Sequence, residues 1–155
     1  MTTINDTKQH LANLFKARFP MIYMESWEEN RIINLINEIA EDKELIKTNR
    51  TVYTWSSTMG LINTTTKSVI NNEYTLVDAI ENFIKFSENA ILILKDIHKD
   101  LSEKTIHLGV TKDITRVLRD TADNLRGSDY VKNIVIIAPV LEIPIELQKD
   151  ITVFD

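Results

Sequence analysis

The sequence contains no cysteine among its 155 residues. Disulfide bonds, thiolate catalysis and zinc sites with thiolate ligands are therefore excluded, and the absence fits a reducing compartment. Membrane signals are also missing. The polar stretch 1–10 has no apolar segment of the kind found in a secretory signal, and no apolar run approaches the roughly 20 residues that span a bilayer. We therefore expect a cytoplasmic protein with no membrane partner.

Basic residues are in the minority, with 18 Lys and Arg against 23 Asp and Glu, which gives a net charge of −5. They are also scattered along the chain. Because nucleic acids bind to a concentrated basic surface, no nucleic-acid partner is predicted. The length, the 43% of hydrophobic residues and the 26% of charged residues are typical of one globular domain over residues 1–155.

Short apolar runs alternate with amphipathic helical patterns along the whole chain. The runs predict five strands: 21–24, 51–55, 90–94, 134–138 and 151–154. Residues that can cap a helix precede the helical patterns: Asp6, Ser26 with Glu29 as a capping box, Thr75 with Asp78, and Thr111. Residues 56–72, rich in Ser, Thr and Asn, predict a loop, with a β-hairpin as the alternative.

This alternation predicts an α/β fold of three layers, with a mostly parallel five-stranded sheet and helices on both faces. That is the layout of P-loop nucleotide-binding domains. The runs 91–94 and 134–137 show no polar alternation, so we expect them near the centre of the sheet, with 21–24 beside one of them. The last strand ends the sequence without a following helix, which suggests a fragment of a longer protein.

The phosphate-binding loop of that layout is missing. After the first strand a P-loop protein needs G-x-x-x-x-G-K-[ST], whose backbone N–H groups and lysine hold phosphates. Residues 25–29 read Glu-Ser-Trp-Glu-Glu, with no glycine, no lysine and three carboxylates that repel a triphosphate. The segment from Gly60 to Ser68 resembles this motif only distantly, because its spacing is wrong and Thr66 stands in place of the second glycine. No cofactor site is predicted in this chain.

Asp96 is the one weak candidate for a catalytic acid. It closely follows the apolar run 90–94, as does the Walker B acid that orients Mg²⁺. A structural role is the alternative: Asp96 caps the next turn or pairs with Lys95. After the fourth strand, where an ATPase of the AAA+ type carries a polar sensor residue, this sequence has Ala138 and Pro139.

Three arginines, Arg116, Arg119 and Arg126, lie on the polar side of one predicted helix. A solvated helix face is the simpler interpretation of this spacing. An arginine finger or a protein interface is the alternative.

Several motifs together resemble the N-terminal domain of a family of AAA+ ATPases, first noted as a hypothetical chloroplast reading frame and widespread in bacteria. They are Arg18-Phe19-Pro20, Val52 to Trp55, Ile93 to His98, Val117 to Asp120, Ile136 to Leu141 and Asp150 to Val153. The resemblance extends from about Leu14 to Asp155.

In that family a degenerate domain without a P-loop precedes the true AAA+ module. The resemblance thus implies that ATP and Mg²⁺ bind downstream, outside this chain, and that the partners are that module and further copies of the parent protein. The AAA+ core also implies a strand order: the strand from Ile151 lies next to that from Met21, and the strand from Thr51 lies at the far edge.

Our leading hypothesis is therefore a non-catalytic scaffold or interaction domain of an AAA+ ATPase. A second hypothesis is a receiver-like signalling domain with Asp96 as phosphoacceptor and Glu25 beside it. A receiver needs Ser or Thr where Ala138 stands, and its second strand lies next to its first. A third is a metal-dependent hydrolase using Asp96, His98 and Glu25, which no spaced ligand motif supports.

Overall fold

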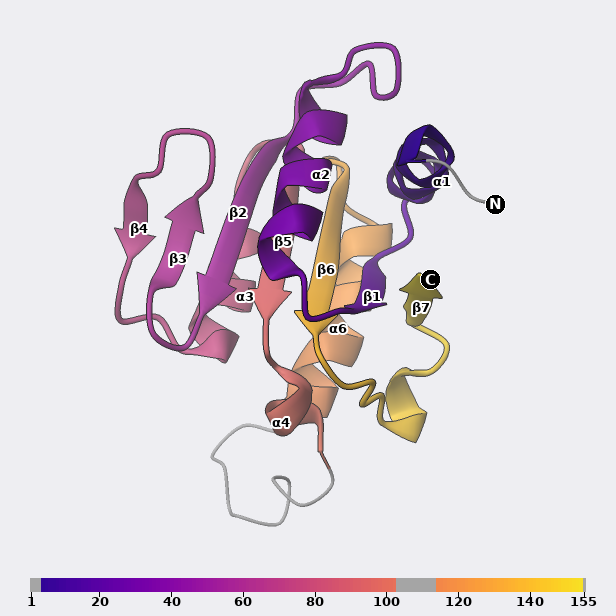
Figure 1. The fold of residues 1–155 in the computed structure, drawn as a ribbon. Helices are drawn as coiled ribbons and strands as arrows, with labels where there is room; N and C mark the ends of the chain where they lie inside the picture. Colours follow the sequence, from indigo (N-terminus) through magenta and orange to yellow (C-terminus); the bar gives the residue numbers. More distant parts are fainter. Residues whose placement is uncertain (1–3, 103–113, 155) are drawn as a thin grey trace.

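The computed structural model describes residues 4–102 and 114–154. Within these ranges a sheet of seven strands runs in the order β4-β3-β2-β5-β6-β1-β7, which Figure 1 shows from left to right. The strands are β1 (Met21–Glu25), β2 (Thr51–Ser56), β3 (Gly60–Asn63), β4 (Val69–Asn71), β5 (Ala90–Lys95), β6 (Lys132–Ala138) and β7 (Ile151–Phe154). Strands β2, β5, β6, β1 and β7 pair in parallel, and β3 and β4 are antiparallel to their neighbours.

The α/β class and all five predicted strands are confirmed, and β5, β6 and β1 lie inside the sheet, as expected. Strand β7 pairs with β1, as the AAA+ order implies. The predicted number of strands is wrong, because residues 56–72 form the hairpin alternative and add β3 and β4. For the same reason β2 ends the parallel part of the sheet but not the sheet itself.

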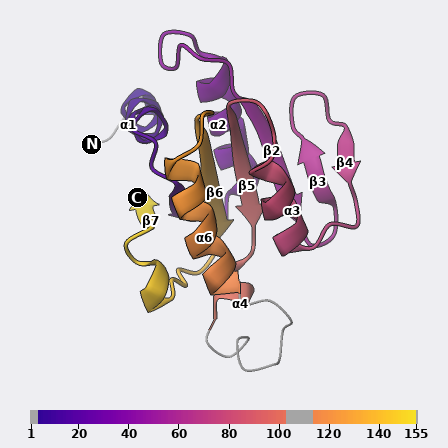
Figure 2. The ribbon, with the colours of Figure 1, turned by 180° about the vertical axis from the view of Figure 1, so that it is seen from behind.

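Helices cover both faces of the sheet. Helices α1 (Ile4–Lys16) and α2 (Glu29–Glu41) lie on one face (Figure 1), and α3 (Leu76–Phe83) and α6 (Ile114–Arg126) lie on the other (Figure 2). Two short helices follow β5 and β6: α4 (His98–Leu101) and the 3₁₀ turn η1 (Ile145–Leu147). No helix in the described part of the chain is long and apolar enough to cross a membrane.

The helix caps match the sequence predictions only in part. Thr75 and Asp78 form the expected capping box at the start of α3. Helix α1 begins at Ile4, so Asp6 lies in its first turn and does not cap it. Thr111 lies outside the described residues.

Two apolar layers hold the sheet between the helices. Along β5, Leu92 and Leu94 face α3 and α6, whereas Ile91 and Ile93 face α1 and α2. All four side chains are completely buried. Burial on both faces explains why the strand is apolar throughout, since a strand with one wet face would alternate.

The segment that distantly resembled a phosphate loop is part of the β3–β4 hairpin. Gly60 opens β3 with a φ of +70°, and a Cβ atom there would come within 2.2 Å of the Asn71 carbonyl oxygen. Only glycine fits this left-handed, crowded position. Residues 60–63 therefore form β3 and residues 64–68 the connection to β4, so this segment does not wrap the start of a helix.

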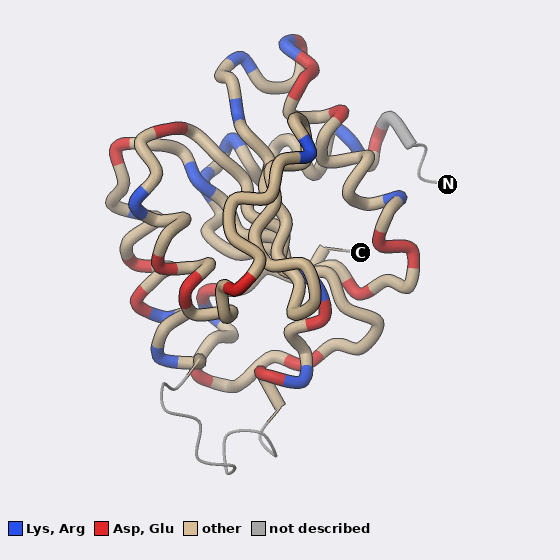
Figure 3. Tube along the Cα trace, turned by 90° about the vertical axis from the view of Figure 1, so that its left-hand side faces the viewer, with Lys and Arg blue, Asp and Glu red and all other residues tan. Residues whose placement is uncertain are grey.

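Charged residues are spread over the helices and loops. Figure 3 shows Lys and Arg interspersed with Asp and Glu on the outside of the molecule, while the middle parts of the central strands are tan.

Candidate functional site

The turn from β1 to α2 occupies the place where a P-loop would begin. The Ser26 N–H donates to the Ala138 carbonyl at 2.8 Å, which extends the β1–β6 ladder by one residue. The Ser26 hydroxyl then accepts from the Glu28 N–H at 2.9 Å. Helix α2 consequently begins at Glu29, with Glu28 as an N-cap that makes no side-chain capping bond. The capping box predicted for Ser26 and Glu29 is wrong.

Carboxylates surround the first turn of α2. Glu28 accepts a bond from Arg31 at 2.7 Å, and Glu29 forms an ion pair with Lys95 at 3.2 Å. Glu25 is exposed at the end of β1. The positive end of a helix dipole attracts anions, but the carboxylates of Glu28 and Glu29 already lie at this end of α2. Lys95, at the end of β5, is paired with Glu29.

A cavity of about 600 Å³, which we call the β5 cavity, lies at the carboxyl ends of four parallel strands. Its walls come from the β1–α2 turn, the ends of β2, β5 and β6, and helix α4. In open α/β folds this edge is where ligands bind. The lining residues are Ser26, Trp27, Glu29, Trp55, Ser57, Lys95, Asp96, His98, Lys99, Asp100 and Pro139.

Asp96 lines this cavity with a left-handed backbone, at a φ of 57°. Its N–H donates to the Ile137 carbonyl at 3.0 Å. Neither structural role predicted for its side chain is correct. Lys95 pairs with Glu29 and not with Asp96, and Ile97 is the N-cap residue of α4, with no side-chain capping bond. The carboxylate is exposed to solvent at the cavity mouth.

Two further titratable groups lie in the same cavity. The Nδ1 atom of His98 is buried without a hydrogen-bond partner. Burial raises the pKa of the Asp100 carboxyl above its ordinary value, and its own backbone N–H and the nearby His98 oppose that shift. The β5 cavity thus holds acids, a histidine and two lysines, so positive and negative side chains line it together.

The two rival hypotheses do not fit this geometry. Strand β1 lies between β6 and β7, three strands away from β2, whereas a receiver would place its first two strands side by side. The proposed hydrolase residues are also separated: Asp96 and His98 share the β5 cavity, but Glu25 lines a different one. Among the described residues, no three His, Asp or Glu side chains cluster closely enough to hold a metal ion.

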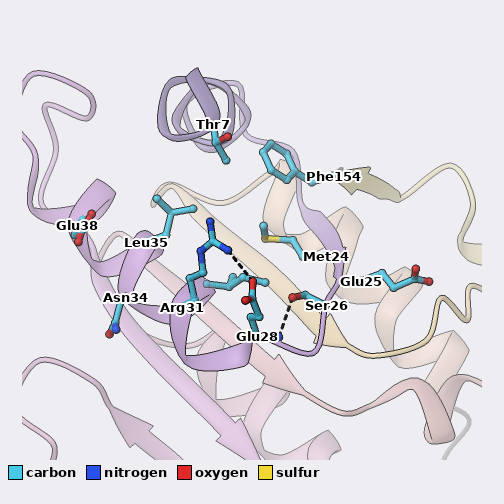
Figure 4. Close-up of a pocket in the computed structure, with 11 residues that line it drawn as sticks. Thr7, Met24, Glu25, Ser26, Glu28, Arg31, Asn34, Leu35, Glu38 and Phe154 are labelled. Atoms are coloured by element: carbon cyan, nitrogen blue, oxygen red, sulfur yellow. Dashed lines mark hydrogen bonds and ion pairs between the residues drawn. The ribbon is translucent and has the colours of Figure 1, made fainter. Parts of the chain in front are cut away.

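Glu25 lines a groove of about 780 Å³ on the other side of the β1–α2 turn (Figure 4). We call it the α1–α2 groove, because α1 and α2 form its sides and the ends of β1 and β7 close it. Its apolar floor is made by Met24, Ile32, Leu35 and Phe154, and its polar rim by Thr7, Glu25, Ser26, Glu28, Arg31, Asn34 and Glu38.

The three arginines of α6 are exposed, as their spacing predicted. Arg116 pairs with Asp120 one turn along the helix at 3.1 Å. Arg126 bonds Asp123 at 3.2 Å and reaches Asp150, before β7, at 2.7 Å. Arg126 therefore ties α6 to the end of the chain. Their role in an interface remains a prediction.

The two tryptophans of the chain differ in their exposure. The Trp27 side chain is 84% exposed at the tip of the β1–α2 turn, whereas Trp55 is 5% exposed and donates to the Tyr74 carbonyl at 2.9 Å. The capping-box interpretation hid this difference, because it placed Trp27 inside the helix. A large exposed tryptophan at this edge is typical of a binding surface.

The layout is thus that of an α/β domain with a mostly parallel sheet and acidic residues at the β1–α2 turn. Residues 7–155 match the family model for the N-terminal domain of SpoVK-like AAA ATPases, and the chain belongs to this family. The resemblance seen in the sequence is confirmed by two curated relatives, both called uncharacterized AAA domain-containing protein ycf46. The one from Guillardia theta is 32% identical over 142 residues, and the one from Trieres chinensis is 29% identical over 142 residues.

The matches to both relatives cover 90% of this chain but only 25% and 26% of the relatives. This chain thus spans about a quarter of the length of the curated relatives it matches. Among solved structures, a chain in the structure of Drosophila ORC bound to DNA aligns over 99% of this chain and 93% of that chain, with 9% identity and a TM-score of 0.43. At that level of likeness, the description of the fold rests on the strand topology given above.

Proposed function

We propose that this domain is a non-catalytic scaffold that precedes the ATP-hydrolysing module of an AAA ATPase and mediates its contacts with that module or with other subunits. The observation that carries the proposal is the β1–α2 turn. Where a P-loop would wrap phosphates, Glu25 ends β1, Glu28 and Glu29 lie at the start of α2, and Lys95 is paired with Glu29.

The other strand ends support the same conclusion. Asp96 is a weak Walker B-like candidate, but the wall across the β5 cavity offers no glycine-rich loop to hold the phosphates that Mg²⁺ would bridge. Pro139 replaces a polar sensor after β6. In this proposal ATP and Mg²⁺ bind to the downstream module, and the copies of the parent protein associate in the cytoplasm.

Calorimetric titration of the 155-residue chain with Mg²⁺·ATP tests this proposal. We expect no saturable heat up to about 1 mM nucleotide. A dissociation constant weaker than about 1 mM corresponds to a binding free energy less favourable than about −4 kcal/mol. Micromolar affinity would defeat it, since a phosphate site would then exist despite the three carboxylates. The Asp96→Asn variant serves as a matched control, because it removes one negative charge from the β5 cavity without touching the β1–α2 turn.

A further inference from the structure

The α1–α2 groove is an open hollow with an apolar floor. Met24, Ile32 and Phe154 are each less than 10% exposed and form its bottom, and Leu35 is half-buried on one side. Figure 4 shows Leu35, Met24 and Phe154 around one hollow, with Thr7 of α1 on its far side. An ion pair of 2.7 Å between Lys8 and Glu38 joins the two helices along its rim.

We propose that this groove receives the polypeptide segment that follows β7 in the longer proteins of this family. The inference rests on the proposed function, since it requires an AAA module after this domain. It names the surface through which the domain would hold that module, which the proposed function leaves open.

The first argument is where the chain leaves the domain. Phe154, the last residue of β7, is itself part of the groove wall, and its ring lies 5.0 Å from that of His10 on α1. Because β7 is parallel to β1, its carboxyl end lies at the same edge as Glu25. The matched family is described as an N-terminal domain, and this chain spans a quarter of its relatives. A following segment would therefore emerge directly at the groove.

The second argument is chemical complementarity. Glu28 lies on the rim of the hollow beside Arg31, whereas Glu25 points away from it (Figure 4). The Arg31–Glu28 pair is exposed, with side chains 71% and 63% exposed, so another cation can replace Arg31 at little cost. The occupant should therefore carry apolar side chains toward Met24, Ile32 and Leu35 and a Lys or Arg toward Glu28.

The third argument is the effect of a covalent connection. A segment joined directly to Phe154 has an effective concentration in the groove of about 1 mM. Even a weak contact with a dissociation constant of about 0.1 mM would then fill about nine-tenths of the grooves. The groove can thus hold the following segment although the contact between them is weak.

Because the chain has no cysteine, thiol labelling can test this directly. We would place a single cysteine in the groove with Leu35→Cys, and a matched one at an exposed site on β4 with Val69→Cys. Maleimide labelling of each position, followed by peptide mass spectrometry, is compared between the 155-residue chain and the polypeptide of the whole reading frame. Reading each peptide separately keeps any downstream cysteine out of the measurement.

We expect the Leu35→Cys thiol to react about tenfold more slowly in the longer polypeptide, and the Val69→Cys thiol to react at an unchanged rate. Adding Glu28→Lys should restore fast labelling of the groove, whereas the control Glu73→Lys, a charge reversal before α3, should not. Equal rates in the two polypeptides would overturn the inference, as would equal protection at both positions. The proposed scaffold role would still stand in that case, because the ATP titration judges it separately.

Discussion

Asn133 provides the most demanding stability test of the fold. Its side chain is completely buried at the start of β6 and joins two distant parts of the chain. It accepts a bond from the Arg50 guanidinium at 2.9 Å and donates one to the Phe19 carbonyl at 2.8 Å. Arg50 is only 9% exposed, and its Nε atom has no partner. Burial, followed by the nearby charge of Arg18, lowers the pKa of Arg50 to about 10.

The Asn133→Ala variant removes both bonds and leaves a buried cation with no side-chain partner. A bond to a charged group contributes about 1.5–3 kcal/mol and a neutral one about 1 kcal/mol. We therefore expect the free energy of unfolding to fall by about 3 kcal/mol. The Arg50→Met variant should cost less, about 1 kcal/mol, because it removes the buried charge together with its need for a partner.

Urea denaturation followed by tryptophan fluorescence measures these changes, since Trp55 is buried and will report unfolding. In the double variant, the Asn133→Ala change should cost about 1.5 kcal/mol less than it does alone. A loss below about 1 kcal/mol for Asn133→Ala, or additive effects in the double variant, would refute the reasoning.

Three further predictions concern single positions. Gly60→Ala should destabilise the chain by at least about 2 kcal/mol in the same assay, because its Cβ would collide with the Asn71 carbonyl at 2.2 Å; an unchanged midpoint would contradict this. Asp96→Gly should stabilise it by about 0.5 kcal/mol, because glycine adopts a φ of 57° without the Cβ penalty, and a loss would mean that the carboxylate makes a contact. Asp100→Asn should be more stable than the wild type at pH 7. Burial raises the folded-state pKa of this carboxyl, so the stability carried by its protonated form is lost as pH rises. The gain should disappear below the ordinary pKa of 3.8, and a gain that persists there would have another cause.

The sheet could be predicted from the sequence because its signal is local. The runs 90–94 in β5 and 134–138 in β6 are apolar at every position, which is typical of a strand covered on both faces. The absence of a P-loop is likewise visible in five consecutive residues. The hairpin was harder to predict, since the polar residues around Gly60 also suit an irregular loop, and the close approach of Asn71 is visible only in three dimensions.

Two local patterns of the same kind had different outcomes. Thr75 and Asp78 form a capping box, but Ser26 and Glu29 do not. The Ser26 N–H bonds to Ala138, more than a hundred residues away, and its hydroxyl turns to the Glu28 N–H. Strand pairing of this kind is not contained in a four-residue pattern. The exposure of Trp27 and the cavities on the two sides of the β1–α2 turn could not be predicted for the same reason.

Asp96 offers the most direct test of the central claim, that this domain does not carry out the chemistry of the ATPase. Steady-state ATP hydrolysis and melting temperature would be measured in parallel for the polypeptide of the whole reading frame and its Asp96→Asn variant. We predict that hydrolysis stays within about threefold, because the exchange changes a solvent-exposed carboxylate with no phosphate site to serve. A large loss of hydrolysis without a loss of melting temperature would show that Asp96 is a genuine catalytic acid and would contradict the account.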